Sequence, residues 1–242
     1  MLKLIPHRRL PNLSTYRAIS ASEPASVIAE QYRKIRTNID LSNLDKPIQT
    51  IAITSSMGHE GKTMTAINLA TVYAQSEVKT LIIDLDLRKP KVHRGFGIVN
   101  ENGIADVIVH GYPLEKAIRK ISDYLHVLPT GAKLPFPSEF LSSQKFKTFL
   151  TEVSKGYDRV IIDTPPVSAV ADAVIIAKQV DGTLFVIASR LTTVDTAQAV
   201  IKNLSDNSIN LLGAVLTRVQ KKDQRYLNYY YYNYAYADDV TE

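Results

Sequence analysis

The sequence predicts an α/β protein built on a doubly wound, mostly parallel sheet. Six short segments are apolar along their length, as is typical of strands that helices cover on both faces: residues 50–54, 80–85, 125–128, 159–163, 183–188 and 211–216. Stretches with helical character lie between them, at residues 62–76, 103–109, 113–120, 138–154, 171–179 and 192–206. Because alternating strands and helices build parallel sheets and the linkers are short, we expect one domain.

Composition divides the chain into an arm, a domain and a tail. Residues 1–22 contain two prolines and no apolar period, which predicts an extended N-terminal arm. Residues 23–220 form the folded domain, which begins with a helix at 23–41. Residues 221–242 form a low-complexity C-terminal tail. Seven tyrosines fall within eleven positions of this tail: Tyr226, Tyr229, Tyr230, Tyr231, Tyr232, Tyr234 and Tyr236.

Composition also restricts the classes of function. The 242 residues include no cysteine, which excludes disulfides, thiolate zinc sites and cysteine nucleophiles. The net charge is +5, but the basic residues are spread in small groups, so nucleic-acid binding is not expected. No stretch approaches the ~18 apolar residues of a membrane span, and the N-terminus does not resemble a signal peptide. We therefore expect a soluble, cytoplasmic protein that reaches a membrane only through a partner.

Residues 51–63 have the pattern of a phosphate-binding loop. An apolar strand, a turn from Ser56 to Gly61 and the start of a helix follow one another. In a P-loop, backbone N–H groups and the helix N-terminus converge on phosphate oxygens. Lys62 is expected to reach the β- and γ-phosphates, and the Thr63 hydroxyl to bind Mg²⁺. The predicted nucleotide contacts are Gly58, His59, Glu60, Gly61, Lys62, Thr63 and Met64.

Three aspartates stand at the ends of predicted strands. Asp84 and Asp86 occupy alternate positions where an apolar strand runs out, so they would face the same way if the strand continues that far. Asp163 follows another apolar segment, the Walker B form, whose carboxylate holds Mg²⁺ directly or through water. Any one of these aspartates alone could be a turn or a helix cap. Three of them beside a P-loop indicate a Mg-nucleotide site at the carboxyl ends of the strands.

These residues together resemble the bacterial tyrosine kinases of capsular and exopolysaccharide synthesis. The similarity is greatest to the cytoplasmic autokinases of Gram-positive bacteria, whose membrane-spanning modulator is a separate chain. It covers nearly the whole chain from about Glu23. It rests on the P-loop, the Walker A′ box at 84–88, the Walker B box at 160–166, the tyrosine cluster, and the spacing of Glu30, Arg33 and Arg36.

The resemblance implies a protein-tyrosine autokinase that uses ATP and Mg²⁺. Asp84 would accept the phenolic proton, which tyrosine with its pKa near 10 does not give up readily. Asp86 and Asp163 would order Mg²⁺ together with Thr63, and Lys62 would complete the catalytic set. The phosphoacceptors would be the seven tail tyrosines of a neighbouring subunit.

The resemblance also implies partners. Glu30, Arg33 and Arg36 lie three residues apart and share one helix face. By composition alone, a solvated ion-pair face is the simpler interpretation. In the family this motif is an oligomer interface, which implies a homo-oligomeric ring. A transmembrane modulator, a cognate tyrosine phosphatase and recruitment to the inner face of the membrane follow from the same resemblance.

The sequence departs from the family pattern at several positions, and rival functions remain. His59 stands where the family usually has a second loop glycine, and Phe136 replaces the asparagine of a Pro-Asn-Pro segment. Thr217 and Arg218 follow the last strand, where related ATPases often use an asparagine to contact adenine. The main alternative is a partitioning or positioning switch ATPase, which would carry an extra lysine where this chain has Met57. A nucleotide-binding scaffold is a third possibility, and the tail could instead be a packed aromatic edge, a stacking surface or an aggregation-prone segment.

Overall fold

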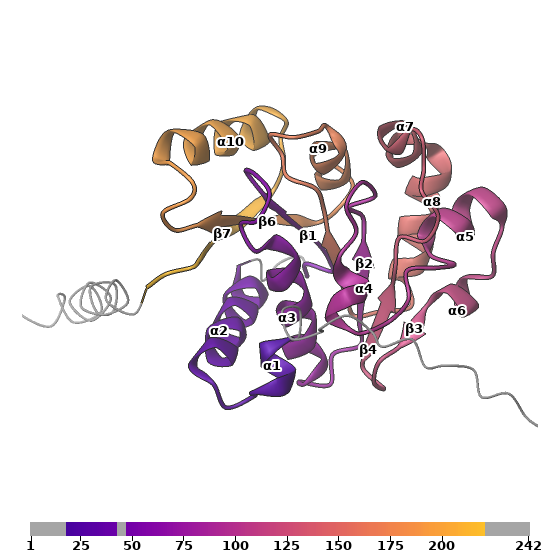
Figure 1. Cartoon of the computed structure of the whole chain (residues 1–242), viewed down its shortest axis with the longest axis horizontal. Helices are drawn as coiled ribbons and strands as arrows, with labels where there is room; N and C mark the ends of the chain where they lie inside the picture. The colour runs from indigo at the N-terminus through magenta and orange to yellow at the C-terminus, as the bar shows by residue number, and fades with distance from the viewer. Residues whose placement is uncertain (1–17, 43–46, 221–242) are drawn as a thin grey trace, which may run out of the picture.

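The computed structural model describes residues 18–42 and 47–220, and these form a seven-stranded sheet covered by helices (Figure 1). The predicted tail and most of the predicted arm lie outside the described residues. The strand order is β3-β4-β2-β5-β1-β6-β7, and every neighbouring pair is parallel except β3 with β4. The strands are β1 (Thr50–Ser55), β2 (Thr80–Asp84), β3 (Arg119–Lys120), β4 (Leu125–Leu128), β5 (Arg159–Asp163), β6 (Gly182–Ala188) and β7 (Leu211–Thr217). The predicted fold class is confirmed.

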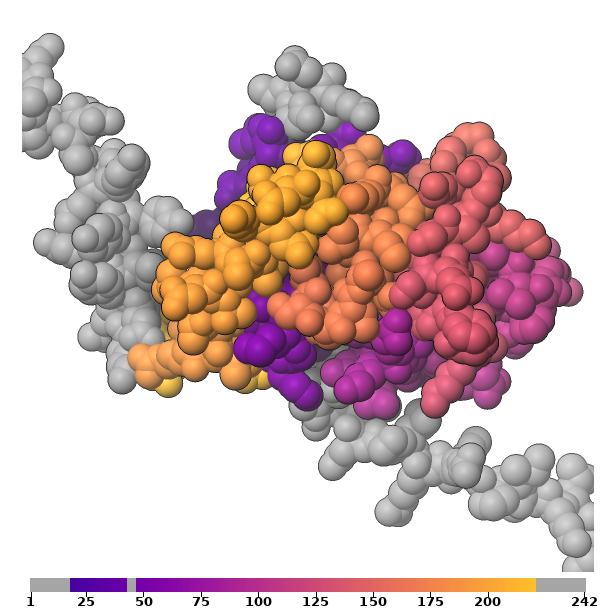
Figure 2. All heavy atoms as spheres, turned by 90° about the horizontal axis from the view of Figure 1, so that it is seen from above, coloured from indigo at the N-terminus to yellow at the C-terminus, as the bar shows by residue number. Residues whose placement is uncertain are grey.

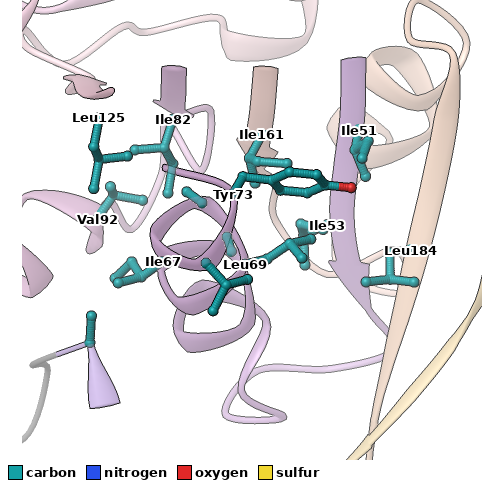
Figure 3. Packing of buried hydrophobic residues seen from close by; sticks show 14 of the residues in the cluster. Ile51, Ile53, Ile67, Leu69, Tyr73, Ile82, Val92, Leu125, Ile161 and Leu184 are labelled. Carbon is teal, nitrogen blue, oxygen red and sulfur yellow. The ribbon is translucent and has the colours of Figure 1, made fainter. Parts of the chain in front are cut away.

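Helices cover both faces of the sheet. They are α1 (Ile19–Ser22), α2 (Val27–Leu41), α3 (Lys62–Ala74), α4 (Val92–Gly95), α5 (Ile104–His110), α6 (Leu114–Ala117), α7 (Pro137–Ser142), α8 (Gln144–Ser154), α9 (Asp172–Ala177) and α10 (Val194–Asp206). The strands send alternate side chains to the two faces. Ile82 joins the core beneath α3, while Leu81 and Ile83 join the core beneath α5 and α8. Figure 3 shows the first core, where side chains from five strands point toward α3.

The order of the strands places the site at the middle of the sheet. β1 and β5 are neighbours there, and the chain leaves β1 toward β2 but leaves β5 toward β6. Such a reversal of direction is where open α/β sheets bind ligands, beyond the carboxyl ends of the strands. In the space-filling view, a group of purple atoms from the early part of the chain is visible among the orange atoms of the C-terminal part, next to magenta atoms (Figure 2). Asp163 is register partner of both Ile53 and Asp84, so the three strand ends meet.

Several elements differ from the prediction, each for a local reason. The predicted helix at 138–154 is two helices, because Ser143 adopts an extended conformation and caps α8 by accepting the N–H of Phe146. The predicted helix at 113–120 ends as α6, and residues 119–120 pair with β4 as β3 instead. Residues 19–22, predicted to be extended, form α1. There Ser20 is buried and donates its N–H to Asn68 Oδ1 of α3 at 2.9 Å.

Candidate active site

The loop between β1 and α3 has the backbone of a phosphate cradle. Gly61 has a φ of +97° and His59 a φ of +68°, both in the left-handed region that glycine adopts without strain. A Cβ on Gly61 would lie 3.4 Å from Thr217 Cγ2, an ordinary van der Waals contact, so the backbone conformation and not the space is what favours glycine there. His59, which replaces a family glycine, takes the conformation that a glycine would take. The loop thus has a left-handed residue at this position despite the substitution, and His59 itself is exposed.

The P-loop lysine and threonine converge on the two predicted metal-binding carboxylates. Lys62 Nζ donates to Asp86 Oδ2 at 2.8 Å and lies 3.6 Å from Asp163 Oδ1. Thr63 Oγ1 donates to Asp163 Oδ2 at 2.7 Å. All four side chains are buried. Burial by itself lowers the pKa of Lys62, but the charges of Asp163 and Asp86 outweigh it and raise the pKa above its ordinary value. The structure thus brings together four of the residues that the sequence selected.

Asp84 lies beneath this group and has different contacts. β2 ends at Asp84, so Asp86 sits in the following turn and the two carboxylates do not extend from one strand face as expected. Asp84 Oδ2 accepts the N–H groups of Lys91 and Val92 at 2.9 Å each, and Oδ1 accepts the N–H of Asp86 at 3.2 Å. Complete burial, followed by the nearby charge of Asp163, raises the pKa of Asp84 to about 8. At neutral pH such a carboxyl is largely protonated, and in its ionised form it is a stronger base than an ordinary aspartate.

The raised pKa of Asp84 predicts how the stability of the nucleotide-free protein depends on pH. An aspartate in an unfolded chain has a pKa of about 3.9, so folding at neutral pH favours the protonated carboxyl. The contribution of Asp84 to the free energy of unfolding is complete below that pKa and is lost as the pH rises toward 8. We expect wild-type stability, relative to Asp84→Asn, to fall by about 1 to 2 kcal/mol between pH 6 and pH 8 in urea denaturation. Parallel pH profiles of the two proteins would contradict this.

Glu60 stabilises the P-loop through hydrogen bonds of its buried side chain and its backbone. Its side chain is fully buried, with Oε2 accepting the Met57 N–H at 2.7 Å and Oε1 accepting the Thr192 hydroxyl. Its backbone oxygen accepts the Thr217 hydroxyl at 2.6 Å. Thr192 follows β6 and Thr217 ends β7, so Glu60 links the P-loop to the two neighbouring strand ends. The sequence predicted Glu60 to be a nucleotide contact. It did not link Glu60 to either threonine, because nothing in their local sequence indicates contacts across more than a hundred residues.

The donor atoms fit a magnesium ion completed by nucleotide phosphates. Asp163 Oδ1 is buried and accepts no hydrogen bond, and it lies beside Thr63, Asp86 and Lys62. Among the described residues, no group of three His, Cys, Asp or Glu side chains forms a complete metal cage. Mg²⁺ in nucleotide enzymes is usually held by one or two carboxylates together with substrate phosphates, so such a cage is not required.

Arg88 fixes the turn that follows Asp86. Its Nε donates to Asp172 Oδ2 at 2.9 Å and its Nη2 to Asp172 Oδ1 at 3.3 Å. Asp172 is fully buried at the start of α9 and also accepts the hydroxyl of Ser138 in α7. A two-bonded guanidinium–carboxylate pair holds both groups in one orientation. The Walker A′ turn is thereby tied to two helices that follow it by more than forty residues in the sequence.

The predicted interface residues lie on α2, away from the nucleotide loop. Arg33 Nη1 pairs with Glu30 Oε2 at 2.9 Å, and Arg36 Nη1 donates to the Val72 carbonyl of α3 at 3.0 Å. Arg33 and Arg36 are half-buried, and Glu30 is exposed. The roles of these residues stay predictions, and the seven tail tyrosines lie outside the described residues. None of the helices in the described ranges is both long and apolar enough to cross a bilayer.

Comparison with known proteins agrees with this geometry. The family model described as AAA domain matches residues 48–211. The tyrosine-protein kinase YwqD of Bacillus subtilis (strain 168) is 41% identical over 215 residues, which cover 88% of this chain and 90% of that relative. The crystal structure of the chimerical protein CapA2B2 matches with a TM-score of 0.81 and 35% identity, over 84% of this chain and 90% of that one.

A second solved structure, the kinase domain of the Escherichia coli tyrosine kinase ETK, matches with a TM-score of 0.78 and 30% identity. The match covers 89% of this chain and 87% of that one. Each of these matches covers more than four-fifths of this chain. The chain belongs to the family of bacterial tyrosine kinases and is a protein-tyrosine kinase.

Proposed function

We propose that the chain transfers the γ-phosphoryl group of Mg-ATP to the 226–236 tyrosine cluster of a neighbouring copy. The observation that carries this is the convergence of Lys62, Thr63, Asp86 and Asp163 above Asp84 at the carboxyl edge of the sheet. The cluster combines a cation for phosphoryl charge, oxygen donors for a divalent metal, and a buried carboxylate that can take a proton.

Each residue of the site has a separate role in the proposed phosphoryl transfer. The tyrosine Oη–phosphorus bond forms while the bond between the γ-phosphorus and the bridging oxygen of ADP breaks, and the phenolic proton passes to Asp84. Lys62 stabilises negative charge on the transferred group, and Glu60 holds the loop that positions it. Thr63, Asp86 and Asp163 would hold Mg²⁺, which would supply positive charge to neutralise the nucleotide phosphates.

The proposal extends to the setting of the reaction. In a homo-oligomeric ring in which α2 supplies Glu30, Arg33 and Arg36 to the interface, the tail of one subunit reaches the site of the next. Recruitment to the inner face of the membrane would use a separate transmembrane modulator, and a cognate phosphatase would reset the tail. The output would be control of capsular or exopolysaccharide synthesis. The family membership and the exposed ion-pair face of α2 support this setting.

A mixing experiment tests transfer between copies. One partner carries Lys62→Met with an intact tail, and the other has wild-type Lys62 with all seven tail tyrosines changed to phenylalanine. Incubated together with Mg-ATP and a modulator fragment, they are expected to give phosphotyrosine on the Lys62→Met chain, located by mass spectrometry. Neither partner should be labelled alone. Absence of label in the mixture, when wild type labels itself, would show that transfer occurs only within one chain.

The rival switch ATPase predicts a different pattern. It would hydrolyse Mg-ATP in a Lys62-dependent manner and form no phosphotyrosine on either chain. Met57, where such ATPases carry a lysine, is 40% exposed and supplies no charge to the loop. This substitution favours the kinase assignment over the switch.

A further inference from the structure

Four cationic residues stand on the turn that follows the catalytic carboxylates and on the short helix α4 after it. The backbone of this turn is bonded directly to those carboxylates: the Lys89 N–H donates to Asp86 Oδ1 at 3.1 Å, and the Lys91 N–H to Asp84 Oδ2 at 2.9 Å. Whatever the side chains of Arg88, Lys89, Lys91 and Arg94 bind is therefore held beside the point of phosphoryl transfer. We call these four residues the basic rim.

The basic rim offers exposed positive charge to a partner. Arg88 is paired with Asp172 yet keeps 42% of its side chain exposed. Lys89 and Arg94 are exposed and Lys91 is half-buried. Within residues 18–42 and 47–220, none of these last three makes an ion pair. Solvated lysines and arginines on a rigid turn are suited to bind an anionic partner that arrives with the acceptor.

The tail carries a matching charge immediately beyond its last tyrosines. Tyr234 and Tyr236 are followed by Asp238 and Asp239. An extended chain spans at most about 3.5 Å per residue, so a carboxylate two residues beyond an acceptor tyrosine lies roughly 7 Å away. The backbone N–H of Lys89 is bonded to Asp86, three residues earlier in the chain. From that backbone position, an extended lysine side chain reaches a similar distance. Tyr236 at the carboxylates thus brings the acid pair to the rim, and Tyr234, four residues before Asp238, places it roughly 14 Å away at full extension.

We propose that the basic rim binds the acidic end of a second copy's tail and so selects Tyr236 and Tyr234 as the first acceptors. The inference rests on the proposed function, because it takes the tail as the substrate. Once formed, a phosphotyrosine carries about −1.5 to −2 charges and replaces the acid pair as the ligand of the rim. Phosphorylation then proceeds toward Tyr226, with each product residue positioning the next acceptor.

The test uses a tail peptide of residues 222–242 and full-length kinase whose own seven tail tyrosines are changed to phenylalanine. Both are supplied with Mg-ATP and a modulator fragment. The rim variant is Lys89→Glu with Arg94→Glu, which leaves the backbone bonds to Asp84 and Asp86 available. The control variant changes two exposed cations elsewhere, Lys147→Glu in α8 and Lys202→Glu in α10, and so alters net charge equally. The complementary peptide carries Asp238→Lys and Asp239→Lys.

The expected result is a rise of about tenfold or more in KM for the wild-type peptide with the rim variant, from two lost and two repelling surface charges. The KM for ATP and the kcat at saturating peptide should stay within about twofold, and the control variant should match wild type. The lysine-bearing peptide should restore a low KM with the rim variant only. Mass spectrometry at early times should find phosphate on Tyr236 and Tyr234 with wild type, and no positional order with the rim variant.

Other outcomes overturn the proposal in distinguishable ways. If the rim variant phosphorylates the peptide normally and its KM for the peptide is unchanged, the tail does not dock on the basic rim. The proposed function would be unaffected by that result. A rise in the KM for ATP instead assigns the rim to the nucleotide. If wild type labels an unrelated tyrosine copolymer in a Lys62-dependent manner but never labels the tail peptide, the tail is not the acceptor and both proposals fall.

Discussion

Replacing Lys62 with methionine is expected to lower phosphotyrosine formation by about a hundred- to a thousandfold, the effect of removing one charge-stabilising donor from an active site. Methionine keeps the approximate length of the side chain but removes the ammonium group that donates to Asp86 Oδ2 at 2.8 Å. The change also leaves two buried carboxylates without their counter-charge, and breaking a buried pair costs about 3 to 5 kcal/mol before proton uptake compensates. We therefore expect the variant to be less stable as well as inactive.

Two measurements separate these effects. Initial rates of tail phosphorylation report the loss of catalysis, and urea denaturation of the same preparation shows the fraction that is folded. Lys178→Met, which removes an exposed lysine in the turn after α9, should match wild type in both. A folded Lys62→Met protein that retains more than about a tenth of the wild-type rate would be inconsistent with the role given to this lysine.

Asp84→Asn is expected to lower the rate by about a hundred- to ten-thousandfold, the range for loss of a general base. Asparagine has nearly the same shape but cannot take the phenolic proton. Since Asp84 bonds to the backbone N–H groups of Asp86, Lys91 and Val92 and is not one of the proposed metal ligands, ATP binding should persist. Isothermal titration with a non-hydrolysable ATP analogue should give a dissociation constant within about threefold of wild type.

Asp86→Asn is expected to affect nucleotide binding differently from Asp84→Asn. Asp86→Asn weakens the pair with Lys62 and removes a metal ligand, so it should weaken Mg-nucleotide binding along with the rate. If Asp84→Asn and Asp86→Asn lost binding and rate in the same proportion, the two carboxylates would not have separate roles. Retained activity in Asp84→Asn would transfer the proton-accepting role to another group.

The architecture follows from the sequence because its signals are local and repeated. All six predicted strands are present, since an apolar run such as β2 or β5 has few alternatives to a doubly covered strand. The predicted helix and strand bounds are wrong where a local interaction overrides the periodic sequence pattern. Ser143 divides a long helical stretch by capping α8, and β3 exists only because β4 offers it hydrogen bonds.

The site is predictable to the extent that its chemistry lies in contiguous motifs. Lys62, Thr63 and Asp163 meet because a P-loop and a Walker B strand are adjacent in this fold. The partners of Glu60 and Arg88 could not be found in the same way, since Thr192 and Asp172 are distant in sequence and of ordinary type. Position along a strand was likewise insufficient for Asp84 and Asp86, because the chain turns between them and gives each a separate set of donors.

The contact between Arg36 and α3 has a consequence for assembly. Arg36 Nη1 donates to the Val72 carbonyl in the last turn of α3, where a cation also complements the helix dipole. This bond uses one nitrogen of the guanidinium and leaves other donors for a neighbour. An arginine that is free in solution gives up as much as about 2 kcal/mol of rotamer entropy when it is immobilised. In the proposed ring, Arg36 has already lost much of that freedom within its own subunit, so a neighbour meets a preorganised side chain and the interface forms at a lower entropic cost.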